Sequence, residues 1–81
     1  MNTVEILAAK FNIDLSQAAQ IVTMVETGND SYYLGKELYE TLRDYYLKTG
    51  ELSADFVNSG GDYRGCFLNS KLDEEVKNAN A

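Results

Sequence analysis

The sequence predicts a small all-α domain of three to four helices, in which two short N-terminal helices pack on one long helix and an irregular C-terminal region covers the rest. Proline, the usual helix breaker, is absent from all 81 residues. Apolar side chains recur at helical spacing in three segments before residue 50, and asparagine or glycine follows each segment. We expect one helical domain over residues 1–77 and a frayed tail over residues 78–81.

The first predicted helix covers residues 4–11, with Thr3 as its N-cap. Asn12 and Ile13 form the turn that follows. One face of this helix is apolar and carries Val4, Leu7, Ala8 and Phe11. This spacing is typical of a short helix that lays one side on a core.

The second predicted helix begins after Asp14, its expected N-cap, and ends at Gly28. Gln17 stands where a capping box places Glu or Gln. The predicted apolar side consists of Leu15, Ala18, Ala19, Ile21, Val22 and Val25. We therefore expect the first two helices to form a tight pair.

The third predicted helix is the longest, starting at Asp30 or Ser31, running to Thr49 and stopping at Gly50. A leucine ridge of Leu34, Leu38 and Leu42 gives it a core-facing side, which Tyr45 extends. Gly35 lies inside it at a cost of ~1 kcal/mol relative to alanine. We expect this glycine to permit close packing by another helix.

Tyrosines recur every seven residues beside the leucine ridge, at positions 32, 39 and 46. A phenol combines a large apolar area with one polar group, so this stripe fits a surface that binds another macromolecule. The candidate partner-binding residues are Tyr32, Tyr33, Tyr39, Glu40, Asp44, Tyr46, Leu47, Tyr63 and Arg64. The alternative is that most of these rings close the core of a thin domain.

The region after Gly50 has weaker patterns. Residues 53–58 fit one helical turn that buries Leu52, Phe56 and Val57, and residues 58–62 fit a loop. Residues 63–68 fit a short extended piece. Ser70 then caps a predicted last helix over residues 71–76, which has acidic residues near its start at positions 73–75.

Composition argues against catalysis and against cofactors. The chain has no histidine, which is the commonest general base and transition-metal ligand. Its single cysteine, Cys66, cannot build a zinc site, and its neighbours Phe67 and Leu68 predict a buried thiol. We therefore expect neither an enzyme nor a bound metal or cofactor.

Charge bears on the partner. Thirteen acidic residues against seven basic ones give a net charge of −6, which disfavours nucleic acid and anionic membranes and suits a protein with a basic surface. On the third helix, Asp44 and Lys48 are placed for an i,i+4 ion pair. No apolar run is long enough to span a bilayer and no targeting segment precedes the first helix, so we expect a cytoplasmic protein.

The first two helices resemble two families. Leu7, Ala8, Phe11, Asn12, Ile13, Ala18 and Ile21 resemble the spacing of a helix-turn-helix over about twenty residues. That resemblance implies a DNA-binding regulator whose second helix enters the major groove. The matching helix departs from the pattern because no lysine or arginine lies between Asp14 and Gly35.

The same stretch is similar to the three-helix ubiquitin-associated domain. Ile13, Ala18, Ile21, Val22 and Gly28-Asn29 carry the likeness. The family's loop of methionine, glycine and an aromatic is replaced here by residues 11–13, Phe-Asn-Ile. Both resemblances imply a compact helical architecture.

The function predicted from these observations is that of a small acidic protein-binding module. It suits a phage or mobile-element inhibitor or adaptor that occludes a site on a partner protein, and equally a homodimer that packs its aromatic stripes together. One alternative is the helix-turn-helix regulator. Another is a small anionic ligand bound by the loop at residues 60–65, with Arg64 as its counter-ion.

Overall fold

The structure is a computed structural model that describes residues 2–62 and 66–80, and within those ranges it consists of helices and the loops that join them, without a strand. The elements, in chain order, are α1 (Thr3–Phe11), α2 (Leu15–Thr27), the 3-10 helix η1 (Ser31–Leu34), α3 (Lys36–Thr49), α4 (Ala54–Asn58) and α5 (Cys66–Asn80). The predicted all-α class is confirmed. No helix in the described part of the chain is both long and apolar enough to cross a bilayer.

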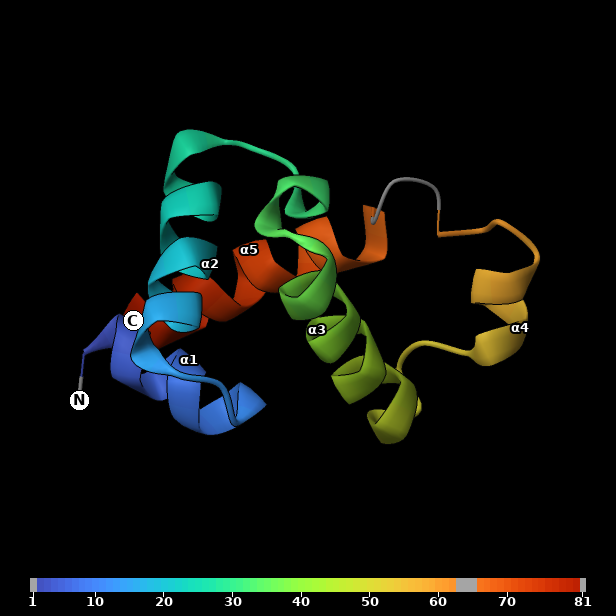
Figure 1. The fold of residues 1–81 in the computed structure, drawn as a ribbon, viewed down its shortest axis with the longest axis horizontal. Helices are drawn as coiled ribbons and strands as arrows, with labels where there is room; N and C mark the ends of the chain where they lie inside the picture. The colour runs from blue at the N-terminus through green and yellow to red at the C-terminus, as the bar shows by residue number, and fades with distance from the viewer. Residues whose placement is uncertain (1, 63–65, 81) are drawn as a thin grey trace.

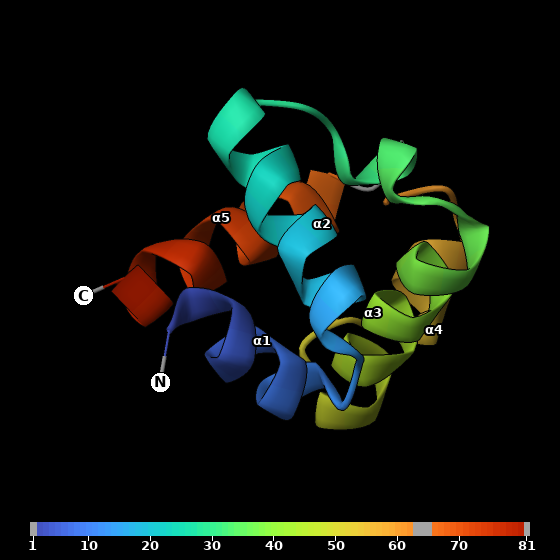
Figure 2. The same ribbon diagram turned by 60° about the vertical axis from the view of Figure 1, so that its left-hand side comes forward.

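Helices α1, α2 and α5 pack against one another at one end of the molecule, and α3 and α4 lie toward the other end (Figures 1 and 2). The start of α1 and the end of α5 lie close together in both views. Thr3 Oγ1 donates a hydrogen bond to Asn80 Oδ1, and the Lys10 ammonium pairs with the Glu75 carboxylate at 2.7 Å. The last helix therefore closes directly onto the first.

The helix ends of the N-terminal pair follow the capping signals, with one shift. Asn2 rather than Thr3 caps α1, because Asn2 Oδ1 accepts from the Glu5 amide at 2.9 Å and Glu5 Oε1 accepts from the Asn2 amide at 3.2 Å. The capping box at the start of α2 is confirmed: Asp14 Oδ1 accepts from the Gln17 amide at 2.7 Å. Asn12 ends α1 with a φ of 55°, a conformation that asparagine tolerates.

The single long helix predicted over residues 31–49 is wrong. Gly35 has a φ of 97° and a ψ of 151°, which no helix accommodates, so the segment divides into η1 and α3. The predicted stop at Gly50 is confirmed, with a left-handed φ of 84°. The glycine that was expected to admit a neighbouring helix is instead a break in the backbone.

The C-terminal region is more regular than predicted. Helix α5 has 15 residues and includes 66–68, which were expected to be extended, and 78–80, which were expected to fray. Residues 63–65 lie outside the described ranges. Leu68, Leu72 and Val76, spaced by four residues, place one side of α5 in the core.

The short helix α4 matches the predicted turn at residues 53–58 in position but not in burial. Ser53 Oγ caps it by accepting from the Phe56 amide at 3.0 Å. Leu52 is buried as expected, Val57 is half-buried, and Phe56 is 46% exposed. The Phe56 ring lies against Gly61, where an added Cβ would come within 2.6 Å of the ring. The loop therefore holds a largely exposed ring in place.

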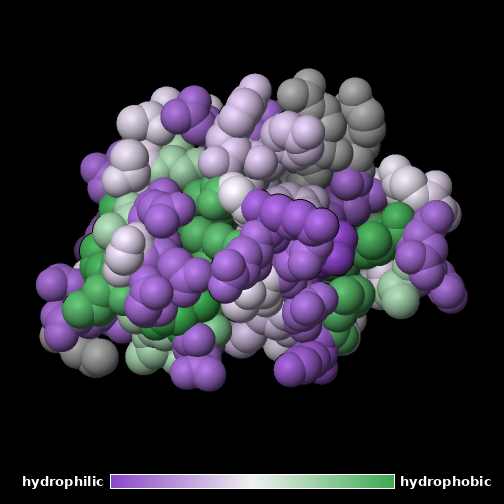
Figure 3. Space-filling model, in the orientation of Figure 1, coloured by the Kyte–Doolittle hydropathy of each residue, from purple (hydrophilic) through white to green (hydrophobic). Residues whose placement is uncertain are grey.

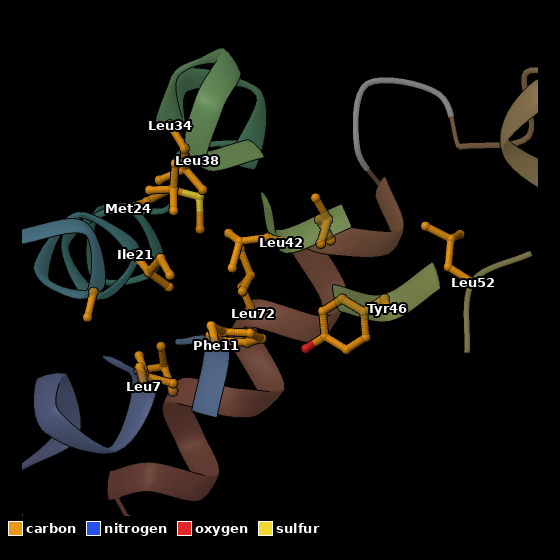
Figure 4. Close-up of a cluster of buried hydrophobic side chains, with 13 residues drawn as sticks. Leu7, Phe11, Ile21, Met24, Leu34, Leu38, Leu42, Tyr46, Leu52 and Leu72 are labelled. Atoms are coloured by element: carbon orange, nitrogen blue, oxygen red, sulfur yellow. The ribbon is translucent and has the colours of Figure 1, made fainter. Parts of the chain in front are cut away.

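The core joins all elements except α4. Its members are Leu7, Phe11, Ala18, Ile21, Met24, Leu34, Leu38, Leu42, Tyr46, Leu52, Leu68, Leu72 and Val76. Figure 4 shows Met24 of α2 meeting Leu34 and Leu38, and Phe11 close to Leu72.

The apolar side predicted for α2 is only partly right. Leu15 is 58% exposed and Ala19 is exposed, because α2 buries the narrower side formed by Ala18, Ile21 and Met24.

Candidate protein-binding surface

The four candidate tyrosines that the structure describes occupy different environments. Tyr32 and Tyr33 are 60% and 70% exposed on η1, Tyr39 is half-buried on α3, and Tyr46 is 1% exposed. The break at Gly35 takes Tyr32 off the helix that carries the other two. The seven-residue repeat therefore does not form a continuous stripe.

Tyr46 belongs to the core and is removed from the candidate surface. Its ring packs edge-on against Phe11, Tyr45 and Phe67, with centroid distances of 6.0, 5.0 and 5.5 Å. Its hydroxyl group is buried without a hydrogen-bond partner among the described residues, and in Figure 4 its oxygen points toward Phe11. Burial, followed by the charge of Glu75, raises the pKa of the phenol far above its ordinary value.

The remaining candidates on α3 do not converge on one side. Glu40 and Leu47 are half-buried and Asp44 is exposed. Asp44 lies five residues after Tyr39, which places the two about 140° apart around the helix. In the described ranges no ion pair joins Asp44 to Lys48, contrary to the prediction, and the ion pairs there are Lys10–Glu75 and Lys71–Glu51. Tyr63 and Arg64 lie outside the described residues.

Tyr32 and Tyr33 stand at the centre of the surface that remains. Their rings meet edge to face, with centroids 5.7 Å apart and planes at 87°. Together with Tyr39 they form what we call the aromatic ridge. Figure 3 shows pale side chains of intermediate hydropathy at the top of this face, where Figure 1 places η1.

Two hollows adjoin the Tyr32–Tyr33 pair. The larger one, about 330 Å³, is lined by Tyr32, Gly35, Lys36 and Tyr39. The smaller one, about 210 Å³, lies between Tyr33 and the end of α2, where Met24 and Thr27 contribute to its wall. Each ring of the pair therefore borders a hollow of its own.

Asn69 of α5 holds the start of η1 in place. Its Oδ1 accepts from the Ser31 amide at 2.6 Å, and its Nδ2 donates to Asp30 Oδ1 at 3.0 Å. Ser31 is fully buried and Leu34 anchors the other end of η1 in the core. The role of Asn69 could not be predicted from the sequence, because a contact across 38 residues leaves no local pattern.

Tyr39 lines the larger hollow, and Arg43, one turn further along α3, lies over its ring. The Arg43 guanidinium carbon lies 5.9 Å from the centroid of the Tyr39 ring. Burial raises the pKa of the Tyr39 phenol, the nearby Asp62 carboxylate raises it further, and Arg43 opposes both effects. The ring is therefore held in place by its contacts and remains a neutral phenol at pH 7.

A separate hollow of about 440 Å³ lies between the end of α1 and α3, on the other side of α3 from Tyr39. Phe11 and Tyr45, whose ring centroids are 4.9 Å apart, line this hollow, and so do Asp44 and Lys48. The nearby Lys10 ammonium is already paired with Glu75, which raises the Lys10 pKa. Asp44 thus belongs to this hollow and not to the aromatic ridge.

Three further predictions concern chemistry and DNA. Cys66 is exposed in the first turn of α5, so the prediction of a buried thiol is wrong. No group of His, Cys, Asp and Glu side chains suited to a metal occurs in the described residues. In α2, Gln17 Oε1 accepts a hydrogen bond from the Asp14 amide at 3.2 Å, so this side chain is already engaged in capping the helix.

Comparison with known proteins adds no relative, since no protein-family model, curated protein or solved structure matches this chain.

Proposed function

We propose that this chain is a protein-binding module whose contact surface is the aromatic ridge of Tyr32, Tyr33 and Tyr39. One observation carries the proposal: two adjacent tyrosines, each more than half exposed, meet edge to face on a short helix that is anchored at both ends. Tyrosine is enriched in the centres of interfaces because it offers a large contact area with few rotatable bonds.

The anchoring supports a surface that is already ordered before binding. Asn69 fixes the start of η1 through Asp30 and Ser31, and Leu34 fixes its end. A surface that is rigid in the free protein loses less entropy when it binds. Among the described residues, Phe56 is the other exposed ring, but it is less exposed than either tyrosine and has no second ring beside it.

Within this proposal the chain acts without catalysis in the cytoplasm, as an inhibitor or adaptor of the phage or mobile-element type that covers a site on a partner. The DNA-binding alternative has less support, because α2 carries no lysine or arginine and Gln17 is engaged in its own cap. The anionic-ligand alternative depends on Arg64, which lies outside the described residues.

The test is site-specific photo-crosslinking in cells that express the chain naturally. A photoreactive phenylalanine replaces Tyr33, and a matched control replaces Asn78, which is exposed near the end of α5. We expect a protein adduct at residue 33 that is absent at residue 78. Equal adducts at both positions, or none at residue 33, would overturn the proposal.

A variant separates loss of binding from loss of fold. Because both side chains are largely exposed, Tyr32→Ala/Tyr33→Ala should retain the helical circular dichroism of the wild type. The same variant should no longer recover the crosslinked partner by affinity purification. Recovery at the wild-type level would exclude the ridge as the contact surface.

A further inference from the structure

The hollow between the end of α1 and α3 plays no part in the proposed function. Its volume of about 440 Å³ lies within the range of small-molecule sites. The Phe11 ring of α1 and the Tyr45 ring of α3 both line it and pack edge-on against each other. Phe11 is buried and Tyr45 is half-buried, so packing holds the apolar part of this lining in place.

Three charged side chains also line the hollow, those of Lys10, Asp44 and Lys48. The Lys10 ammonium is neutralised by the Glu75 carboxylate, 2.7 Å away. Asp44 and Lys48 are in no ion pair within residues 2–62 and 66–80, although they stand four residues apart on α3. The hollow therefore offers a ligand one carboxylate and one ammonium group.

The order of polar groups along α3 gives the hollow a direction. The Thr41 hydroxyl donates to the Glu37 carbonyl at 2.9 Å, so toward a ligand it is an acceptor. Two acceptors, Thr41 and Asp44, thus precede the donor Lys48. Residues four apart on a helix are about 6 Å apart along its axis, which leaves room for one small group between their side chains.

The balance of charge selects among small ligands. A simple anion would meet the Asp44 carboxylate and a chain whose net charge is −6. A simple cation would meet the Lys48 ammonium. A zwitterion satisfies both side chains, and an exposed helical ion pair contributes so little that the two groups lose almost nothing by binding a ligand instead of each other.

We infer that this hollow binds a free α-amino acid with a large apolar side chain. The ligand's ammonium group pairs with Asp44 and donates to the Thr41 hydroxyl. Its carboxylate pairs with Lys48, and its side chain covers the Tyr45 ring. The site lies on the other side of α3 from Tyr39, so it is separate from the aromatic ridge and does not depend on the proposed function.

The test is an NMR titration of the isotope-labelled full-length chain with L-phenylalanine, L-leucine and L-tryptophan at millimolar concentrations. We expect at least one of them to shift the amide signals of residues 10–12 and 41–48 in a saturable way. The Tyr32→Ala/Tyr33→Ala variant should bind the same amino acid with unchanged affinity. Absence of these shifts with all three amino acids would overturn the inference and leave the protein-binding proposal standing.

Analogues of the amino acid that binds test the role of its two charges. The amine without the carboxylate and the acid without the ammonium should each bind about fivefold more weakly or worse, because each loses one ionic contact. The N-acetyl amide keeps the side chain and carries neither charge. If it binds as tightly as the free amino acid, the hollow takes an apolar side chain of a protein segment, and the inference is wrong.

Charge variants assign the two ends of the ligand. Asp44→Asn should weaken binding of the amino acid about fivefold without weakening the acid analogue, and Lys48→Gln should do so without weakening the amine analogue. The matched controls Asp73→Asn and Lys77→Gln make the same changes in charge at exposed positions of α5 and should have less than about a twofold effect. Equal losses in the two sets of variants would show that only overall charge matters, which contradicts the inference.

Discussion

The tyrosines of η1 and those in the second half of α3 have opposite environments, although the same seven-residue spacing links them. Tyr32 and Tyr33 project from a short helix, whereas Tyr46 packs among Phe11, Tyr45 and Phe67. Gly35, with a φ of 97° and a ψ of 151°, separates η1 from α3 and so takes Tyr32 and Tyr33 off the helix that carries Tyr46. The packing around each ring then decides whether the phenol lies in the core or on the surface.

The largest effect expected from this comparison is on Tyr46. Replacing Tyr46 with alanine removes a fully buried ring, and we expect a loss of about 3–5 kcal/mol in the free energy of unfolding. Tyr33→Ala, the matched change in the exposed group, should cost less than about 0.5 kcal/mol. Urea denaturation followed by circular dichroism measures both. Similar costs for the two variants would contradict the division into core and ridge.

The next effect concerns the break itself. Gly35→Ala places a Cβ in open space but on a backbone with a φ of 97°, so only the backbone strain opposes it. We expect a loss of about 1–3 kcal/mol, by urea denaturation. Glu37→Ala on the exposed side of α3 is the control and should stay within about 0.5 kcal/mol of wild type. If Gly35→Ala left the free energy of unfolding unchanged, residues 31–49 would be able to form one helix.

A smaller effect is expected at Asn69, whose side chain holds the start of η1 by two hydrogen bonds. Asn69→Ala removes the acceptor of the Ser31 amide and the donor to Asp30, and should destabilise the chain by about 1–2 kcal/mol. Because the Ser31 amide loses its partner, its hydrogen exchange should accelerate more than exchange in α1 or α2. Uniform acceleration across the chain would indicate global destabilisation and not local loosening of the ridge. Asn78→Ala, exposed on the same helix, is the control.

The smallest effect is on alkaline unfolding. The pKa of Tyr46 is raised by burial, so the folded state keeps its proton when the unfolded state, with an ordinary phenol pKa of about 10, loses it. This contribution is fully present below about pH 10 and is lost as the pH rises toward the raised folded-state pKa. Tyr46→Phe, which keeps the ring, should move the alkaline unfolding midpoint to higher pH. Tyr33→Phe should leave it in place.

The N-terminal half of the fold was predictable because its signals are local. Asp14 and Gln17 are neighbours in space and in sequence, and Gly28 and Gly50 stop their helices for reasons of backbone geometry alone. Gly35 shows the limit of that reasoning. A glycine inside an amphipathic pattern is compatible with a helix at small cost or with a break, and tertiary packing chooses between them.

The C-terminal helix and the ridge were harder to predict for different reasons. Leu68, Leu72 and Val76 carry a helical pattern, but Asn69 and Ser70 resemble a turn and a new cap, which obscured the first turn of α5. For the tyrosines no sequence rule was available, since a phenol suits both the margin of a core and an interface. Only the packing of Phe11, Tyr45 and Phe67 around it places Tyr46 in the core.

The closure of α5 onto α1 and α2 has a consequence for dissecting the molecule into fragments. A fragment without α5 would leave Leu7 and Ile21, which are fully buried in the whole fold, without the apolar contacts of this helix. The caps of α1 and α2 are local and need no contact with α5, but the two helices alone have too little core to form an independent folding unit.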